Sequence, residues 1–199
     1  MRWDNLFDDL EGQLEQELTL DEIDLQAEEE RLRLGRLTLR SRLVGLGSAA
    51  VVRVGLVSGD TLTVRPTTFG RDWLAADILN ENRDAGSDST GAMCVLPFTA
   101  VVSVVLRAEQ IPLSLGDEGE SAARFVERIG IPFVLRDLCR RRKRVTVITT
   151  MGEISGTIDR VGRDHFDLAV HAAGAYRRAA AVTEFRIVPL AHLVLVKLD

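Results

Sequence analysis

The residues best suited to do chemistry form a basic run, Arg140-Arg141-Arg142-Lys143-Arg144, with Arg136 one helical turn earlier. Guanidinium groups bind phosphates through paired hydrogen bonds, so this run favours a nucleic-acid partner, RNA first and DNA second. Arg177 and Arg178 lie beside Tyr176 in a polar segment and extend the predicted nucleic-acid site. The alternatives are, in order, a dock for an acidic segment or a protein partner, and a solvated helix end that stabilises its dipole.

The acidic segment is the start of the chain. Residues 1–30 hold twelve of the 30 acidic residues and one of the 25 basic residues, a net charge of −11. The rest of the chain then has 18 acids and 24 bases, or +6, so the total of −5 is the difference between two unlike regions. An acidic arm joined to a basic body keeps nucleic acid open as a partner despite the negative total.

The arm has an apolar face. Across residues 3–18, apolar side chains follow the three-and-four spacing of an amphipathic helix that could bind a partner groove. The predicted partner-binding residues are Trp3, Leu6, Phe7, Leu10 and Leu14. Thr19 and Glu22 form a capping box, which predicts a second helix after them. Leucines recur every seven residues from Leu18 to Leu46, which leaves open a coiled coil or an arm packed on the body.

Other side chains that often carry chemistry lack partners at a useful spacing. His165, His171 and His192 have no cysteine or carboxylate partners at metal-ligand spacing, so no metal or cofactor is expected. Cys94 and Cys139 are too few for a disulfide scaffold, and neither has a nearby histidine to activate it. Because no nucleophile, acid–base pair or phosphate-binding glycine loop is visible, we expect no enzyme activity.

Two β-rich blocks follow the arm, and each is typical of a small five-stranded barrel. In the first block, β-branched runs and turn signals predict strands within residues 50–56, 61–64, 73–78 and 93–106, the last broken by Pro97. In the second block they predict strands within residues 145–150, 154–161, 165–170 and 185–196, the last broken by Pro189. Between the blocks, residues 111–120 are predicted as a loop, and residues 122–129 and 133–143 as helices.

The two blocks look like copies of one another. Gly70-Arg71-Asp72 recurs as Gly162-Arg163-Asp164, and Pro97 recurs as Pro189, both 92 residues later. Apolar residues agree at the same offset around these positions, whereas the turn after the first strand of each block is offset by 93. A shared offset across two blocks predicts an internal duplication.

From about residue 135 onward, the second block resembles the Sm-like family, in particular its Hfq-like members. The arginine-rich helix end enters a β-branched run at residues 145–147, and residues 152–161 are similar to the first Sm motif, with Gly156 at its bend. The resemblance implies a five-stranded barrel, RNA binding and rings formed by pairing of edge strands. The family's aspartate and base-contacting asparagine fall on or near Gly162 and Phe166, and PRC-barrel-like small barrels are the alternative fold.

We therefore expect a mainly β protein with an α-helical N-terminus and two tandem Sm-like five-stranded barrels. The expected regions are an acidic helical arm at 1–46, a first barrel at 47–107, a helical connector with a basic end at 108–144, and a second barrel at 145–199. The predicted function is electrostatic binding of RNA or DNA, with the arm as an internal competitor. The alternative is a protein–protein scaffold or assembly factor that uses the barrels and the N-terminal helix.

Two further expectations concern partners and location. Unpaired strand edges favour self-association of copies of the chain. The sequence has no signal-peptide pattern and no apolar run long enough to span a bilayer, so we expect a cytoplasmic protein without a membrane partner.

Overall fold

The computed structural model describes residues 22–47, 49–79, 91–116, 125–172 and 181–198. The chain divides into two units, residues 1–38 and 39–199. In the first unit, residues 22–36 are helical, and exposed ion pairs one turn apart, Arg31–Glu28 and Arg33–Glu30, stabilise that helix. The predicted partner-binding face, Trp3, Leu6, Phe7, Leu10 and Leu14, lies outside the described residues.

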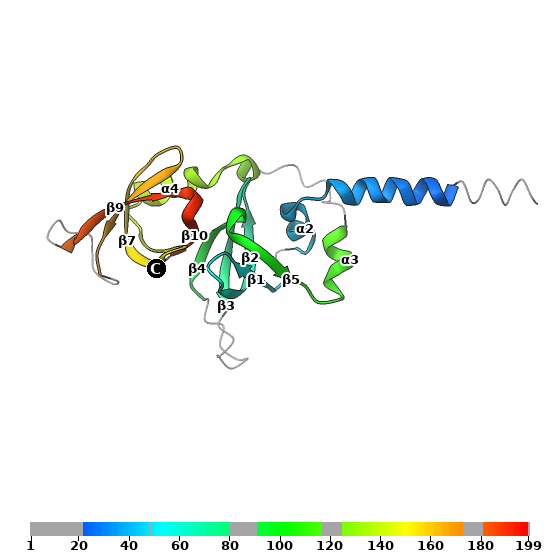
Figure 1. Ribbon diagram of the computed structural model, residues 1–199, viewed down its shortest axis with the longest axis horizontal. Coiled ribbons are helices and arrows are strands. Elements are labelled where there is room, and N and C mark those ends of the chain that lie inside the picture. Colours follow the sequence, from blue (N-terminus) through cyan, green and yellow to red (C-terminus); the bar gives the residue numbers. More distant parts are fainter. Residues whose placement is uncertain (1–21, 48, 80–90, 117–124, 173–180, 199) are drawn as a thin grey trace, which may run out of the picture. The chain divides into compact units, whose positions relative to one another are not determined.

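The second unit is built on one antiparallel sheet of ten strands, in the order β5-β1-β2-β3-β4-β10-β6-β7-β8-β9 (Figure 1). The first half of the unit supplies β1 (Val52–Leu56), β2 (Thr61–Phe69), β3 (Trp73–Leu79), β4 (Met93–Pro97) and β5 (Val101–Val105). The second half supplies β6 (Arg144–Thr149), β7 (Gly152–Val161), β8 (His165–Val170), β9 (Glu184–Pro189) and β10 (Leu193–Leu198). Both halves therefore arrange their five strands in the same order, with the fifth beside the first.

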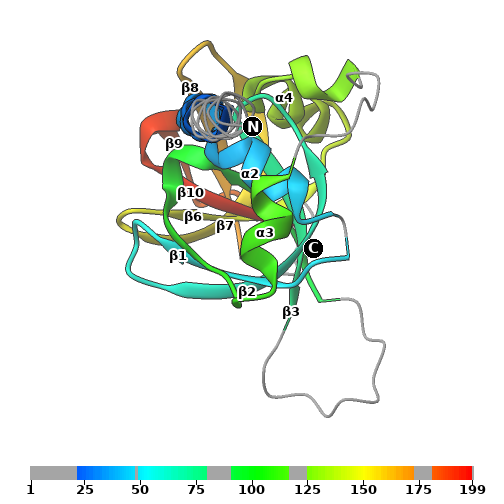
Figure 2. The ribbon, with the colours of Figure 1, turned by 90° about the vertical axis from the view of Figure 1, so that its right-hand side faces the viewer.

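Short helices stand at equivalent places in the two halves. Helix α2 (Leu39–Gly45) precedes β1, and α4 (Ile131–Arg140) precedes β6. A 3-10 turn joins the last two strands of each half, η1 (Phe98–Ala100) in the first and η4 (Leu190–His192) in the second. Each turn follows a proline, which explains why both predicted terminal strands break there. Helix α3 (Gln110–Leu115) contacts α2 (Figure 2), and η2 (Phe125–Arg128) leads to α4.

The pairing between strands repeats from one half to the other. Trp73 lies opposite Pro97 in the β3–β4 pair, and the residues 92 positions later, His165 and Pro189, lie opposite each other in the β8–β9 pair. A β-bulge interrupts β2 between residues 66 and 68 and recurs in β7 between residues 158 and 160. Because a bulge shifts which side chains point inward, its shared position keeps the same faces buried in both halves. We call residues related by this offset counterparts.

Two apolar cores lie along the sheet, and each contains residues from both halves. The first is formed mainly by strands of the first half, but it includes Val194 and Leu195 of β10. The second surrounds Phe166 and Leu168, and it includes Trp73 and Val95 of the first half. Each half therefore completes the core of the other.

The prediction of a mainly β chain is confirmed, but the expected pair of separate barrels is not what the strand pairing shows. In the described residues β4 pairs with β3 and with β10, so the first half does not close on itself and the sheet is open. Continuing the sheet across the two halves satisfies the backbone groups of β4 that closure would otherwise have to satisfy.

The connector between the halves also differs from its prediction. Residues 111–120 were expected to be a loop, yet α3 occupies Gln110–Leu115. Pro112 falls in the first turn of this helix, where its missing N–H has no intrahelical acceptor to lose. Helix α4 starts two residues earlier than predicted, with Pro132 in its first turn for the same reason.

Candidate functional site

The junction between the two halves is the antiparallel pairing of β4 with β10. Val95 lies opposite Val196, and Cys94 lies opposite Lys197. Val95, Val196 and Cys94 are all buried. Burial raises the pKa of the Cys94 thiol to about 11, so the thiol stays protonated at neutral pH. The junction thus joins two strand edges through mainly buried residues, with the partly exposed Lys197 paired to Glu153.

The two outer strands of the sheet, β5 and β9, carry the counterparts of these junction residues. Ile187 of β9 is 72% exposed, whereas its counterpart Val95 is 3% exposed. Val102 of β5 is 67% exposed, whereas its counterpart Val194 is fully buried. In the described part of the chain each outer strand pairs with one neighbour, and an apolar edge of this kind is a template for another strand.

An apolar hollow of 240 Å³ lies beside the β5 edge, between this strand and α2. Its lining is Leu39, Arg42, Leu43, Leu46, Val101, Val102, Ser103, Val104 and Leu106. Its three leucines are Leu39 and Leu43 of α2 and Leu46 directly after this helix, and the residues 92 positions later are Ile131, Leu135 and Leu138 of α4. These α4 residues belong to the core that Trp73 and Val95 of the other half complete. The hollow is therefore the first-half equivalent of a site that the chain fills by itself in the second half.

The two Gly-Arg-Asp turns have one backbone conformation but hold different groups. In each turn the glycine N–H donates to the carbonyl three residues on, at 2.9 Å in the first and 2.8 Å in the second. In the first turn, the Asp72 carboxylate accepts a hydrogen bond from the Ile131 N–H at 2.8 Å and so caps α4. Next to it, the Trp73 indole N–H donates to the Ile129 carbonyl at 2.9 Å.

In the second turn the aspartate contacts its own neighbour. Asp164 Oδ1 lies 2.8 Å from His165 Nδ1, and both side chains are exposed. The hydrogen bond from His165 lowers the pKa of the Asp164 carboxyl. His165 thus stands at the position equivalent to Trp73 but is not buried as Trp73 is.

The predicted basic run closes α4 through a Schellman motif. The Arg142 N–H donates to the Cys139 carbonyl at 3.0 Å, and the Lys143 N–H donates to the Leu138 carbonyl at 3.1 Å. Arg142 has a φ of 52°, the left-handed conformation that helix ends usually assign to glycine. An arginine therefore stands at a position that the backbone alone would give to glycine.

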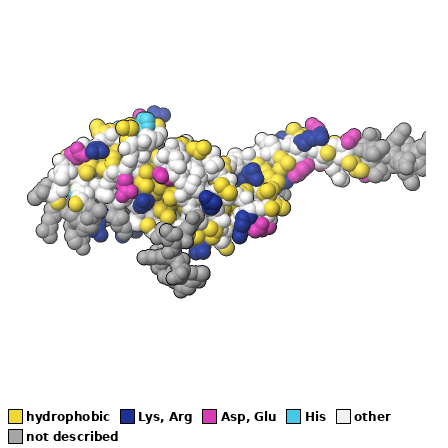
Figure 3. All heavy atoms as spheres, turned by 60° about the horizontal axis from the view of Figure 1, so that its bottom comes forward, with side chains coloured by type: hydrophobic (Ala, Val, Ile, Leu, Met, Phe, Trp, Pro, Cys, Tyr) yellow, Lys and Arg dark blue, Asp and Glu magenta, His cyan; other side chains and the backbone are white. Residues whose placement is uncertain are grey.

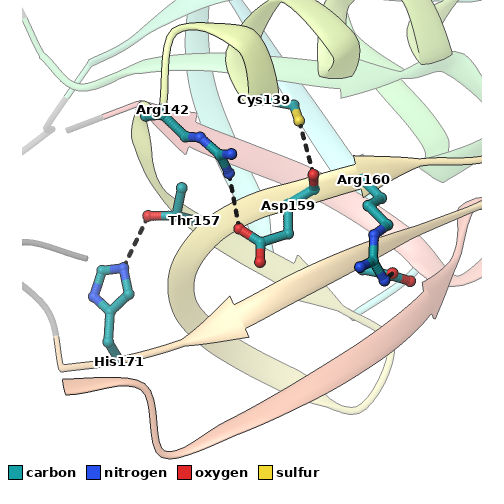
Figure 4. Close-up of polar contacts among 7 residues, drawn as sticks. Cys139, Arg142, Thr157, Asp159, Arg160 and His171 are labelled. Atoms are coloured by element: carbon teal, nitrogen blue, oxygen red, sulfur yellow. Dashed lines mark hydrogen bonds and ion pairs between the residues drawn. The ribbon is translucent and has the colours of Figure 1, made fainter. Parts of the chain in front are cut away.

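Acidic neighbours neutralise part of this run. Asp137 pairs with Arg140 at 2.7 Å and with Arg141 at 2.6 Å, and hydrogen bonds from these guanidinium groups lower its pKa. Arg142 pairs with Asp159 at 3.0 Å (Figure 4). The five cations of the run and these two carboxylates leave a local charge of +3.

Of the remaining predicted nucleic-acid residues, Arg136 lies in the described part of the chain. The Arg136 guanidinium donates to the Gly162 carbonyl at 3.4 Å, beside the second Gly-Arg-Asp turn. Arg177 and Arg178 lie outside the described residues. On the face drawn in Figure 3, the lysine and arginine side chains form separate spots and not one continuous patch.

The other singled-out side chains have structural partners. His171 is buried, with Nε2 at 2.9 Å from the Thr157 hydroxyl (Figure 4) and Nδ1 at 3.2 Å from the Ala172 carbonyl. His192, expected within a strand, lies in the 3-10 turn η4. The Cys139 thiol donates to the Asp159 carbonyl at 3.2 Å.

Neither a metal-ligand cluster nor a membrane-spanning helix is found among the described residues. No three side chains of histidine, cysteine, aspartate or glutamate gather there in a way that could hold a metal ion. Across the same residues, no helix is both long and apolar enough to cross a membrane.

The arginines of the two turns, Arg71 and Arg163, were not among the predicted site residues. Arg71 and Arg163 line one hollow at the start of α4, together with Arg136. Turn residues at this spacing are ordinary turn formers, so the only signal was that the tripeptide occurs in both halves. Comparisons of the chain with family models, with curated proteins and with solved structures gave no match. Function is therefore inferred from the contacts of this chain.

Proposed function

We propose that this protein is a non-catalytic assembly module, in which a duplicated Sm-like unit joins copies of the chain head to tail. The β9 edge of one copy would pair with the β5 edge of the next, as β4 pairs with β10 within the chain. This corresponds to the scaffold alternative of the sequence interpretation, with a second copy of the chain as the first partner.

The duplication is supported by the strand pairing. The two halves share strand order, the β-bulge in their second strand and the hydrogen bonds of the Gly-Arg-Asp turn. The first strand and its turn follow the offset of 93. The Val57 N–H donates to the Ala100 carbonyl, and the Thr150 N–H donates to the His192 carbonyl in the same way. Unrelated β-rich segments would have no reason to share bulges and turn contacts at fixed offsets.

The observation that carries the assembly proposal is the contrast between the buried junction and the exposed sheet ends. The ends carry Ile187 and Val102 where the junction buries Val95 and Val194. The apolar hollow beside β5 is lined by leucines whose counterparts on α4 lie in the same core as Trp73 and Val95. A second copy would bring Ile187 to this hollow, so strand pairing and apolar burial would coincide, as they do inside the chain.

The proposal fixes a register. Because Val95 lies opposite Val196 and Cys94 lies opposite Lys197, Ile187 should lie opposite Val104 of the next copy and Arg186 opposite its Val105. An interface of this kind uses two different surfaces, so it continues from copy to copy until a ring closes or a filament forms.

Cysteine cross-linking tests the register directly. In a Cys139→Ser background, the double variant Val105→Cys/Arg186→Cys should give a ladder of disulfide-linked species under mild oxidation, because directly opposite strand residues lie within disulfide range. The matched control is Val102→Cys/Arg186→Cys, in which the first cysteine is displaced along the strand by three residues, about 10 Å. Equal ladders in both variants, or none in either, would refute the proposed pairing.

The mass in solution provides the second test. Light scattering of the wild-type chain should give a mass above one copy, and the exposed substitution Ile187→Asp should return the mass to one copy. Ile187 is exposed, so at a concentration where both proteins are single copies this variant should keep the unfolding midpoint of the wild type. A wild-type chain that remains a single copy at millimolar concentration would refute the assembly proposal.

The net charge of +3 at the basic run favours a second function, electrostatic binding of RNA or DNA. The test is the salt dependence of binding to a fluorescein-labelled, unstructured RNA of 20 nucleotides. Arg142→Gly removes one cation at a position where glycine suits the backbone, so the fold should survive. The slope of log affinity against log salt should become shallower by about 0.7, and removal of residues 1–30 should tighten binding. An unchanged slope would exclude this run as the RNA site.

A further inference from the structure

A second cationic surface lies at the opposite end of α4 from the basic run. It is a shallow hollow of 260 Å³. Its lining residues are Arg71, Gly130, Pro132, Phe133, Arg136 and Arg163. The three arginines come from three separate elements: the first Gly-Arg-Asp turn, the second Gly-Arg-Asp turn, and α4. The fold thus brings to one place cations that lie far apart in the sequence.

The arginines of this hollow are only lightly engaged by the described residues. Arg71 contacts Asp72 at 3.3 Å, but the other oxygen of that carboxylate accepts the Ile131 N–H. Arg136 makes one long hydrogen bond, 3.4 Å, to a backbone carbonyl. Arg163 makes no hydrogen bond or ion pair with any described residue. Guanidinium donors thus remain for a ligand.

Asp72 pairs with Arg71, but the carboxylates next to Arg136 and Arg163 in the sequence pair with other side chains. Asp164, next to Arg163, lies at hydrogen-bond distance from His165. Asp137, next to Arg136, pairs with Arg140 and Arg141 on the far side of α4. Asp164 and Asp137 are thus engaged by other side chains, and Asp72 is the carboxylate that contacts a guanidinium group of the hollow directly.

Gly130 leaves room for the Arg71 guanidinium in the hollow because it has no side chain. A Cβ atom at this position would lie 2.6 Å from a terminal nitrogen of Arg71 and 3.2 Å from Asp72 Oδ2. The Arg71 guanidinium can therefore lie directly over the backbone at the start of α4. A side chain at this position would require the Arg71 guanidinium to shift.

An aromatic ring completes the surface. Phe133 is 56% exposed, although a phenylalanine on a helix that packs against a sheet is usually buried. A flat heteroaromatic group can stack on such a ring, and bases stack on aromatic side chains without regard to sequence. Guanidinium donors beside an exposed ring match a ligand that carries both a phosphate and a base.

We infer that this hollow binds a nucleotide, with its phosphate on Arg71, Arg136 and Arg163 and its base on Phe133. The nucleotide is either free or one unit of a single strand, and the chemistry of recognition is the same for both. The inference depends neither on head-to-tail assembly nor on the basic run at Arg140–Arg144.

The experiment measures binding of two probes, 5′-AMP by calorimetry and a fluorescein-labelled single-stranded hexa-adenylate RNA by anisotropy. Phe133→Ala should weaken binding by about tenfold and leave the salt dependence unchanged, because stacking carries no charge. Arg163→Gln should weaken binding by about tenfold. For the RNA it should also reduce the slope of log affinity against log salt by about 0.7. Binding of 5′-AMP identifies a free nucleotide as the ligand, whereas binding of the RNA alone identifies a strand.

Matched variants separate this site from general effects of charge and apolar surface. Arg65→Gln removes an exposed arginine of β2, and Phe185→Ala removes an exposed phenylalanine of β9. Both should bind like the wild type. Gly130→Ala should weaken binding with an unchanged unfolding midpoint. Any one of three results overturns the inference. They are no binding of either probe, wild-type affinity in Phe133→Ala, and equal losses of affinity in Arg65→Gln and Arg163→Gln.

Discussion

Trp73 and His165 stand at the same place in the two halves of the sheet, each opposite a proline, yet their surroundings differ. Trp73 is buried under α4 and completes the second core, whereas His165 is partly exposed and contacts Asp164. The backbone template is shared, and the side chains differ according to what each half meets within the chain. Where the second half covers the first, the residues are apolar and buried; at the outer ends, their counterparts are exposed.

The largest expected effect comes from this pair. Trp73→Ala should lower the free energy of unfolding by about 3–5 kcal/mol, because it removes a large buried side chain that completes a core. His165→Ala, the same change at the counterpart, should cost less than about 0.5 kcal/mol, since exposed side chains contribute little. Urea unfolding of both variants measures the difference. Similar costs would show that the two positions are not in different environments.

The second effect concerns a position where one half has glycine and the other half has a larger residue. Gly156 of β7 has a buried valine, Val64, as its counterpart in β2. A Cβ atom on Gly156 would lie 2.4 Å from the Ala169 carbonyl oxygen, which is part of the neighbouring strand and cannot move alone. Gly156→Ala should therefore cost about 2 kcal/mol, as overpacked sites do.

The control for this change is a glycine without such a neighbour. Gly35 has nothing within 4 Å of a Cβ atom and lies in the helical segment 22–36. Gly35→Ala should be neutral or stabilising, because alanine favours a helix more than glycine does. If urea unfolding showed as small a loss of stability for Gly156→Ala as for this control, the second half would have room for a side chain at residue 156, as the first half has at Val64.

Much of this fold could be predicted from the local pattern of the sequence. Strands with alternating or β-branched residues, such as β8 at His165–Val170, were predicted correctly. One face of such a strand packs on the core and the other does not, so its residue types follow the strand period. The repeated tripeptide and prolines gave the offset that the strand pairing follows. Helix α3 was missed because Pro112 and the glycines that follow the helix are typical of a loop, and the sequence does not show that Pro112 falls in a first helical turn.

The sequence could not predict which strand edges meet. The pairing of β4 with β10 depends on backbone groups that are identical in every strand, so no residue type marks it. The hollow of Arg71, Arg136 and Arg163 was missed for a similar reason, since only the folded sheet brings the two turns to one helix. In contrast, the basic run was visible in the sequence, but its partial neutralisation by Asp159 from β7 was not.

The third effect tests how strongly the junction buries the Cys94 thiol. The pKa of Cys94 rises from an ordinary value of 9.0 to about 11 because burial disfavours the thiolate. Ionisation in the unfolded chain then favours unfolding, so this stability is intact below about pH 9 and is lost as the pH rises towards 11. At pH 10 the wild type should have lost roughly 1 kcal/mol relative to Cys94→Ala, compared with the same pair at pH 7.5.

Labelling gives the matching comparison between the junction and the outer edge. At pH 8, Cys94 should react with iodoacetamide only upon unfolding, because its thiol is buried and protonated. A cysteine placed at its exposed counterpart, Arg186→Cys, should react in the folded monomer, which the Ile187→Asp background provides. Rapid labelling of native Cys94 would mean that β4 and β10 separate readily.

The smallest effect distinguishes the two turns. Asp72 caps α4 through the Ile131 N–H, so Asp72→Ala should cost about 1 kcal/mol, the usual value of a helix cap. Asp72→Asn keeps an acceptor oxygen and should recover most of that loss, which separates capping from charge. Asp164→Ala, at the counterpart, should change the free energy of unfolding by less than about 0.5 kcal/mol in the single-copy Ile187→Asp background.

The same pair of aspartates becomes informative once copies assemble. If β9 of one copy docks on β5 of the next as β4 docks on β10, the second turn would approach the start of α2 as the first turn approaches the start of α4. Asp164 would then gain a helix N-terminus to cap, and Asp164→Ala should weaken assembly by about fivefold, the effect of losing one cap. Sedimentation of this variant beside Asp164→Asn measures that change. Equal dissociation constants for wild type and Asp164→Ala would show that the second turn has no partner in the assembly. The interface between copies would then resemble the junction in its strand pairing but not in its turn contacts.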